Sequence, residues 1–455
     1  MNDAVLALQE RFGDRLAVGA AIREQHGRGE SYHPGMPPDA VLFAETTGDV
    51  AEAVGKCHEH GLPVIAFGAG TSLEGNVSAV HGGLCIDLTR MNRILRISAE
   101  DLDCTVQAGV TRVQLNRELR HTGLFFPLDP GADATIGGMA ATRASGTNAV
   151  RYGTMKDAVL GLTVVMADGS VIHTGGRARK SSAGYDLTRL FVGSEGTLGI
   201  MTEAVLRLHG VPDSIVAAAC SFPDLESAVR SVVAVIQSAI PVARVELMDE
   251  AQMRAVNEFS RTGYPVADTL LFEFHGSPVA AADDMRRVAE IVAGFGGGGF
   301  RTASTQEERS TLWKARHDAF YATTALRPGA RGWSTDVCVP IANLAACIEG
   351  ARVALSATAV PATIVGHVGD GNFHVIFAVD PGNARELAEI ADVNARLIDL
   401  AHSLDGTCTG EHGVGTGKRG YMDREHGEAV RVMRMIKHAL DPTSILNPGK
   451  VLPDG

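Results

Sequence analysis

The stretch Gly366-His367-Val368-Gly369-Asp370-Gly371-Asn372-Phe373-His374 lies between two apolar, β-branched runs, residues 362–365 and 375–379. This pattern predicts two strands that meet at a turn, and Asp370-Gly371 suits a two-residue hairpin loop. That register places His367 directly opposite His374, with both side chains on one face and their Cβ atoms about 5 Å apart. The stretch therefore predicts an antiparallel hairpin whose two imidazoles can share a metal ion.

A second glycine-rich stretch, residues 409–415 (Thr-Gly-Glu-His-Gly-Val-Gly), carries an acid and a base side by side. Adjacent side chains diverge, so Glu411 can complete a metal set of two histidines and one carboxylate while His412 faces a substrate as general base. On the residues alone, the alternative that the histidines are structural stays open.

The chain has 455 residues, more than one hydrophobic core usually supports, which predicts two domains. A formal net charge of −12 without a Lys/Arg cluster argues against nucleic acid as a partner. Seven scattered cysteines with no C-x-x-C pair indicate a reducing compartment. Because we find no targeting segment and no apolar run long enough to span a membrane, we expect a cytoplasmic protein, and contact with a membrane surface stays open.

The first half shows a strand–helix–strand pattern over residues 41–67, and its second strand opens into the glycine-rich loop 68–75. Such a loop suggests phosphate binding by backbone N–H groups. Leu73 replaces the third glycine of the dinucleotide fingerprint and no Gly-Lys-Ser/Thr follows, so neither NAD nor ATP is indicated. The blocks 126–153 and 191–200 are also rich in small residues, which permit close approach to an extended, flat ligand.

Together, residues 68–72, 130–153 and 193–199 resemble the FAD-binding domain of the vanillyl-alcohol oxidase type of flavoenzyme. The resemblance covers residues 40–208 and implies that the first loop holds the pyrophosphate. It also implies non-covalent FAD, because no histidine stands beside Gly70, where some relatives attach the flavin. The residues that it assigns to FAD are Gly68, Ala69, Gly70, Thr71, Ser72, Pro130, Thr135, Gly137, Gly138, Ser145, Gly146, Tyr152, Glu195, Gly196, Ile200 and, in a closing motif that returns to the flavin, Asn447.

Past Pro212 the pattern changes to helical apolar stripes that alternate with strands joined by hairpins. This predicts an α+β arrangement with a largely antiparallel sheet. We therefore expect a two-subdomain FAD-binding domain over residues 1–210, with a C-terminal return at 441–455. A substrate or cap domain over residues 211–440 should carry the metal site.

The second half resembles a narrower family, the FAD-dependent D-lactate dehydrogenases of the cytochrome-linked, mitochondrial type. The matching motifs are the two stretches quoted first and residues 312–317, 327–329 and 334–340. The resemblance implies that His367, His374 and Glu411 bind Zn or Mn. It further implies that His412 removes the hydroxyl proton and that Arg316 clamps the substrate carboxylate. The chemistry agrees, because a metal stabilises a developing alkoxide while hydride leaves for flavin N5, and a planar guanidinium matches a carboxylate.

These resemblances predict oxidation of D-lactate or a related D-2-hydroxy monocarboxylic acid, with electrons passed to a cytochrome or quinone. The related D-2-hydroxyglutarate dehydrogenases carry Lys and Asn where Ser334 and Ile376 stand, so a second carboxylate is not expected. The alternatives are the flavin subunit of a glycolate oxidase, a D-2-hydroxyglutarate dehydrogenase-like enzyme, an ether-lipid synthase on the same scaffold, and a non-catalytic binder of FAD and metal. A homodimer stays open.

Overall fold

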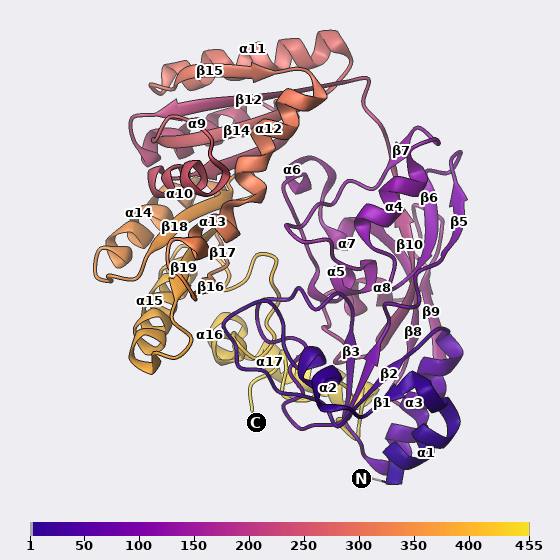
Figure 1. Ribbon diagram of the computed structural model, residues 1–455. Helices are drawn as coiled ribbons and strands as arrows, with labels where there is room; N and C mark the ends of the chain where they lie inside the picture. The colour runs from indigo at the N-terminus through magenta and orange to yellow at the C-terminus, as the bar shows by residue number, and fades with distance from the viewer. Residues whose placement is uncertain (1–2, 455) are drawn as a thin grey trace. The chain divides into compact units, whose positions relative to one another are not determined.

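The computed structural model describes residues 3–454 (Figure 1). Its contacts divide the chain into two compact units. Unit 1 comprises Met1–Ser145, Gly153–Val211 and Glu411–Gly455, and unit 2 comprises Gly146–Tyr152 and Pro212–Gly410. We expected the C-terminal return only from residue 441, but the segment that packs with unit 1 begins thirty residues earlier because the backbone N–H groups of Val414 and Gly415 donate to Glu195.

The first sheet of unit 1 has strand order β1-β2-β4-β3, with β2, β4 and β3 parallel and β1 antiparallel to β2. Helix α3 (Thr47–His60) connects β2 to β3 and begins at a capping box between Thr46 and Asp49. This confirms the expected strand–helix–strand pattern. The strands are β1 (Leu16–Ala17), β2 (Ala40–Phe43), β3 (Val64–Phe67) and β4 (Leu84–Asp87).

The second sheet of unit 1 is antiparallel, with order β5-β6-β10-β8-β9. Its strands are β5 (Ile94–Ser98), β6 (Asp103–Gln107), β8 (Val159–Val165), β9 (Val171–Gly175) and β10 (Ile200–Arg207), and β7 (Leu124–Phe125) pairs separately with β11 (His209–Gly210). The other helices of unit 1 are α1 (Asp3–Phe12), α2 (Ala20–His26), α4 (Arg112–Leu119), α5 (Ile136–Thr142), α7 (Met155–Ala158), α8 (Leu187–Phe191), α16 (Met422–His426) and α17 (Ala429–Leu440).

Unit 2 is built on an eight-stranded sheet in which every neighbouring pair is antiparallel, as expected. Seven strands follow the order β15-β12-β14-β13-β18-β19-β16, and β17 pairs with β19. The strands are β12 (Ser214–Phe222), β13 (Val242–Met248), β14 (Asp268–Gly276), β15 (Gly298–Ala303), β16 (Arg331–Ser334), β17 (Val337–Cys338), β18 (Ala362–His367) and β19 (Asn372–Val379).

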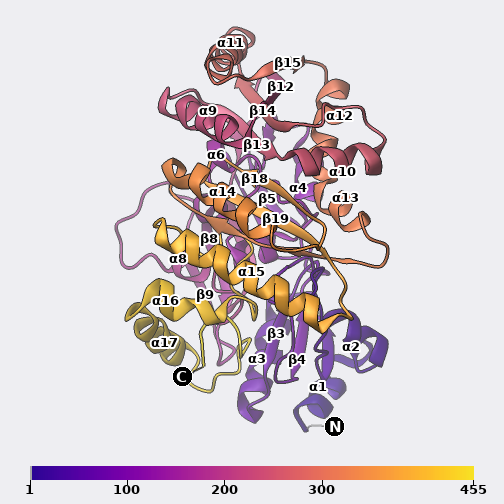
Figure 2. The same ribbon diagram turned by 90° about the vertical axis from the view of Figure 1, so that its left-hand side faces the viewer.

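Two groups of helices contact this sheet. One group is α9 (Leu225–Gln237), α11 (Pro278–Gly294), α14 (Leu344–Leu355) and α15 (Ala384–Ser403), and α14 and α15 lie side by side (Figure 2). The other is α10 (Glu250–Ser260), α12 (Gln306–His317) and α13 (Ala319–Ala325), and the short α6 (Ala149–Tyr152) contacts β13. Met248, Leu271, Val365 and Ile376 pack with α10 and α12 in one core cluster, so these strands turn the same face toward both helices.

Across residues 3–454, we find no helix with both the length and the apolar composition that crossing a membrane requires.

Candidate functional site

The hairpin that contains His367 and His374 forms, but its register differs from the expected one. His367 pairs with Asn372, and Val365 pairs with His374, so residues 368–371 form the loop. The predicted two-residue loop was wrong because it needs positive φ at both central positions, whereas Gly371 has φ +79° and Asp370 does not adopt a positive φ. The two histidines are diagonal neighbours on one face, and their ring centroids lie 5.6 Å apart at 86°.

Hydrogen bonds to the Nδ1 atoms fix how both rings are presented. His367 Nδ1 lies 2.7 Å from Glu246 Oε1, and His374 Nδ1 lies 2.9 Å from the carbonyl oxygen of Thr335. Both oxygens are acceptors, so each Nδ1 carries the hydrogen and each neutral ring keeps its lone pair on Nε2. Histidines that bind metals are usually oriented in this way.

Asp336 fixes the chain segment that leads to Glu411. Its Oδ2 accepts hydrogen bonds from Thr409 Oγ1 and from the Gly410 N–H, both at 2.8 Å, and its Oδ1 accepts one from Asn372 Nδ2 at 2.8 Å. Asn372 Oδ1 is buried and has no hydrogen-bond partner among the described residues. A buried acceptor of this kind fits a site that holds a cation or its water.

Arg316 lies on α12 with its side chain 14% exposed, and its Nε donates to Glu246 Oε2 at 2.7 Å. The bond to Glu246 uses Nε, and the pair of Nη groups at the end of the guanidinium can bind a carboxylate as a fork. Burial alone would raise the pKa of Glu246, but His367 and Arg316 lower it, so this carboxylate is ionised.

In unit 1, the loop that follows Glu411 wraps around Glu74. The N–H groups of Thr416 and Gly417 donate to the Glu74 carbonyl oxygen, at 2.8 and 3.1 Å. The carboxylate of Glu74 lies 3.2 Å from Lys418 Nζ and 3.8 Å from His412 Nδ1. Burial opposes ionisation of Glu74, but Lys418 and the nearby histidines lower its pKa to about 2. His412 therefore has an ionised carboxylate beside one ring nitrogen.

The carboxylate of Glu195 binds the chain itself. It accepts hydrogen bonds from Asn76 Nδ2 at 2.6 Å, Val414 N at 2.7 Å and Gly415 N at 2.9 Å, while Asn447 Nδ2 donates to the Glu195 carbonyl oxygen at 2.7 Å. Glu195 thus ties the loop that follows Glu411, and Asn447, to unit 1.

The glycine-rich loops of unit 1 fit a large cofactor. A Cβ on Gly68 would lie 2.3 Å from Thr135 Oγ1, so a larger residue at position 68 would collide with Thr135. Gly70 has φ +71°, a backbone conformation that favours glycine. Ser72 Oγ and Ser194 Oγ are buried without a hydrogen-bond partner among the described residues. Buried hydroxyl groups of this kind are expected where a bound ligand supplies the partner.

The other residues assigned to FAD lie in both units. Unit 1 contains Ala69, Thr71, Pro130, Gly137, Gly138, Ser145, Gly196 and Ile200, and the Ile200 side chain belongs to its core. Gly146 and Tyr152 belong to unit 2, where the Tyr152 hydroxyl lies 2.7 Å from His275 Nδ1. All of these assignments remain predictions.

Sequence reasoning missed three acids that organise the site: Glu246, Asp336 and Glu74. Glu246 had a detectable signal, because it is one of two charged residues in an otherwise apolar strand, β13. Asp336 belongs to a motif that we quoted but to which we gave no role. Glu74 belongs to a loop that we examined only for its glycines.

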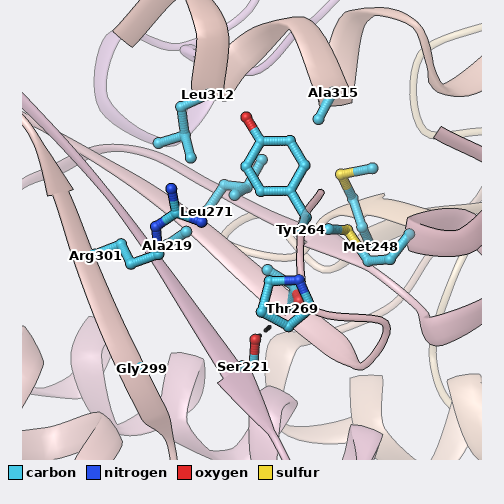
Figure 3. A pocket seen from close by; sticks show the side chains of 12 residues that line it. Ala219, Ser221, Met248, Tyr264, Thr269, Leu271, Gly299, Arg301, Leu312 and Ala315 are labelled. Carbon is cyan, nitrogen blue, oxygen red and sulfur yellow. Dashed lines mark hydrogen bonds between the residues drawn. The ribbon is translucent and has the colours of Figure 1, made fainter. Parts of the chain in front are cut away.

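A small pocket on the α10 and α12 side of the unit 2 sheet is a separate feature (Figure 3). Its lining includes Met248, Leu271 and Leu312, with Tyr264 and Arg301 as its titratable residues. Neither group suits proton removal from a hydroxy acid near neutral pH. The candidate reaction centre is therefore the polar cluster around His367.

Two family models match the chain: "FAD binding domain" over residues 38–175 and "FAD linked oxidases, C-terminal domain" over residues 211–451. A probable mitochondrial D-lactate dehydrogenase of Danio rerio is 51% identical over 441 residues, covering 96% of this chain and 89% of the relative. A mitochondrial D-lactate dehydrogenase (cytochrome) of Arabidopsis thaliana is 44% identical, covering 99% and 80%. A glycolate oxidase subunit of Bacillus subtilis is 35% identical, covering 91% and 89%.

Solved structures confirm the expected flavoenzyme fold. p-Cresol methylhydroxylase gives a TM-score of 0.81 at 20% identity, covering 99% of this chain and 96% of that chain. An alkyldihydroxyacetonephosphate synthase gives 0.77 at 21% identity, covering 98% and 84%. At these identities the likeness concerns the fold alone.

The expected cytoplasmic location was wrong. The D-lactate dehydrogenases of Danio rerio, Arabidopsis thaliana, Kluyveromyces lactis and Saccharomyces cerevisiae that match this chain at 39–51% identity are mitochondrial proteins, which contradicts that expectation.

Proposed function

This chain belongs to the family of FAD-linked oxidases, and we propose that it oxidises D-lactate to the corresponding 2-oxo acid with FAD and a divalent Zn or Mn ion. FAD supplies the hydride acceptor, and the ion would polarise the substrate hydroxyl. Electrons then pass to a cytochrome, an acceptor that the names of several relatives also give. Quinone as an acceptor, contact with a membrane surface and a homodimer stay predictions from the sequence.

One observation carries this proposal: Glu246 holds His367 and Arg316, and the Thr335 carbonyl oxygen holds His374, so two histidines with Nε2 lone pairs and one guanidinium fork are fixed by hydrogen bonds. A 2-hydroxy acid offers the two groups that such a set recognises, a hydroxyl for the metal and a carboxylate for the fork. His367, His374 and Glu411 would hold the ion, since Asp336 fixes Gly410, the residue directly before Glu411.

His412 would take the hydroxyl proton. The ionised Glu74 beside its Nδ1 stabilises the imidazolium that forms, so Nε2 is the nitrogen suited to receive the proton. Arg316 orients the acid by binding its carboxylate. In this arrangement each residue type meets the substrate group that it binds best.

An anaerobic titration tests the proposal. We expect D-lactate to bleach the flavin of the purified protein faster than L-lactate, glycolate or D-2-hydroxyglutarate, and we expect the bleaching to slow after metal removal and to recover with Zn or Mn. If none of the four acids bleached the flavin, the dehydrogenase function would be wrong. Equal bleaching before and after complete metal removal would contradict only the role of the metal.

The glycolate oxidase alternative predicts that glycolate is the best of the four reductants. It is less well supported, because the glycolate oxidase subunit is 35% identical whereas the Danio rerio D-lactate dehydrogenase is 51% identical.

A further inference from the structure

Two buried glutamates occupy neighbouring strands of unit 2 and have parallel sets of partners. Glu246 on β13 is 1% exposed and bonds to His367 and Arg316. Glu273 on β14 is 5% exposed and bonds to His275 at 2.7 Å and to Trp313 at 2.6 Å. Each carboxylate thus joins one histidine of the sheet to one side chain of α12.

The strand register and the helix period explain why the contacts separate in this way. Leu247 pairs with Gly366 in the antiparallel ladder, which brings Glu246 opposite His367 one position further on. Trp313 and Arg316 are three residues apart on α12, so they lie about one turn apart on the same face. The two turns of α12 therefore reach different glutamates.

Glu246 divides its two oxygens between the two functions of the site. Oε1 accepts from His367 Nδ1, which fixes the tautomer and ring angle of a proposed metal ligand. Oε2 accepts from Arg316 Nε, which fixes the plane of the proposed carboxylate anchor. Both distances are 2.7 Å, and both donors reach the same carboxylate, which is 1% exposed.

We infer that Glu246 is a positioning residue that makes metal binding and substrate-carboxylate binding depend on one side chain. This inference rests on the proposed function for the identity of the substrate. Removal of one acceptor oxygen from Glu246 should therefore weaken both ligands together. Each ligand should also bind more tightly when the other is present, because binding of either one orders the shared carboxylate.

Glu246→Gln is the sharpest test because it replaces one of the two acceptor oxygens by an NH₂ group, which donates and so cannot accept from His367 Nδ1 or Arg316 Nε. Glu273→Gln is the matched control, with the same chemical change on the neighbouring strand. We would load both variants with FAD and measure Zn²⁺ and Mn²⁺ affinity by competition with a chromogenic chelator, without substrate. Pyruvate affinity would then be measured from the change in the flavin absorbance spectrum.

We expect Glu246→Gln to weaken metal binding about 10- to 100-fold, the usual effect of losing such a partner, and to weaken pyruvate binding as well. Glu273→Gln should leave metal affinity within about twofold of the unmodified protein. The inference would be overturned if Glu246→Gln bound both the metal and pyruvate with affinities within twofold of those of the unmodified protein. So would equal metal losses in the two variants, because the effect would then be general to the buried face.

Glu246→Asp covers the case in which the glutamine variant does not fold. It keeps the charge but withdraws both oxygens by one methylene, so metal and pyruvate affinity should again fall together; a loss of only one of them would contradict the inference. The metal measurement needs no turnover, so it tests the role of Glu246 even if no hydroxy acid reduces the flavin. A failure of every hydroxy acid to reduce the flavin would count against the proposed function and not against this inference.

Discussion

Lys418 Nζ lies 3.2 Å from Glu74 Oε1, and the two residues are 2% and 6% exposed. This buried pair joins the glycine-rich loop that follows β3 to the loop that carries His412. An ion pair at such a depth stabilises little by itself, but removal of one partner leaves an uncompensated charge in the interior. The pair therefore fixes the position of one loop relative to the other.

The first prediction concerns this pair. Glu74→Gln should lower the free energy of unfolding by about 3–5 kcal/mol, because it removes the negative charge that Glu74 places beside the buried Lys418 ammonium. Urea unfolding of the FAD-loaded protein measures this loss. The double variant Glu74→Gln/Lys418→Met should recover most of it, and a double variant whose loss equals the sum of the single losses would show that the two residues act independently.

The second prediction concerns the proposed base. His412→Ala should bind FAD normally but reduce it with D-lactate about 10²- to 10⁴-fold more slowly, because the hydroxyl proton loses its acceptor. Stopped-flow absorbance of the flavin measures the rate. His317→Ala is the control, since His317 is exposed at the end of α12 and has no assigned role. Loss of FAD from the His412 variant would instead indicate a structural histidine.

The third prediction concerns Asp249, the N-cap of α10, whose side chain accepts from the Gln252 N–H at 2.7 Å. Burial, with a contribution from Asp268, raises its pKa from 3.8 to about 7. Between these two values the folded state binds more protons than the unfolded state, so stability is greatest at low pH and falls as pH rises toward 7. Above that pH the folded protein keeps a partly buried carboxylate whose charge is poorly compensated.

Asp249→Asn should remove this penalty, because asparagine caps a helix as well as aspartate does and carries no charge. The variant should unfold at a higher temperature than the unmodified protein at pH 8, by the equivalent of about 1–2 kcal/mol. Near pH 4 the two should be equal. Thermal unfolding measured from pH 4 to pH 8 checks this, and a constant difference across the range would refute the assigned titration.

The chemistry of the site was more readable from the sequence than its geometry. Glycines in the loop at Gly68 and Gly70 and the histidine stretch are local signals, since each reports a close approach or a ligand type. The hairpin register, in contrast, could not be predicted from the residues of the hairpin alone. A Cβ on Gly371 would lie 2.0 Å from the Val339 carbonyl oxygen, so a segment about thirty residues earlier determines how the loop turns.

The partners that orient the site residues could not be predicted from the sequence either, because they come from distant segments of the chain. Glu246 reaches His367 only because β13 pairs with β18, and it reaches Arg316 only because α12 packs on that face. Glu74 meets Lys418 only after the C-terminal segment has returned to unit 1. In an isolated sequence each of these acids is one charged residue among apolar or small neighbours.

The last prediction concerns substrate size. Ser334 and Ile376 are direct cross-strand partners on β16 and β19, and Ile376 is 3% exposed within the core that faces α12. From the sequence, we aligned these two positions with the Lys and Asn of the related D-2-hydroxyglutarate dehydrogenases. Ser334→Lys/Ile376→Asn should therefore place a cation and an amide side by side, where they can bind a second carboxylate.

We expect the double variant to gain flavin reduction by D-2-hydroxyglutarate, with a KM at least about tenfold below that of the unmodified protein, since a charge-assisted hydrogen bond to a carboxylate contributes about 1.5–3 kcal/mol. Because the asparagine enters a packed core, the variant should also lose about 2–4 kcal/mol of stability. Ser334→Gln/Ile376→Asn is the matched control, which is similar in size but lacks the cation. If the charged and the neutral variant oxidised D-2-hydroxyglutarate equally well, Ser334 and Ile376 would not be the residues that exclude a second carboxylate.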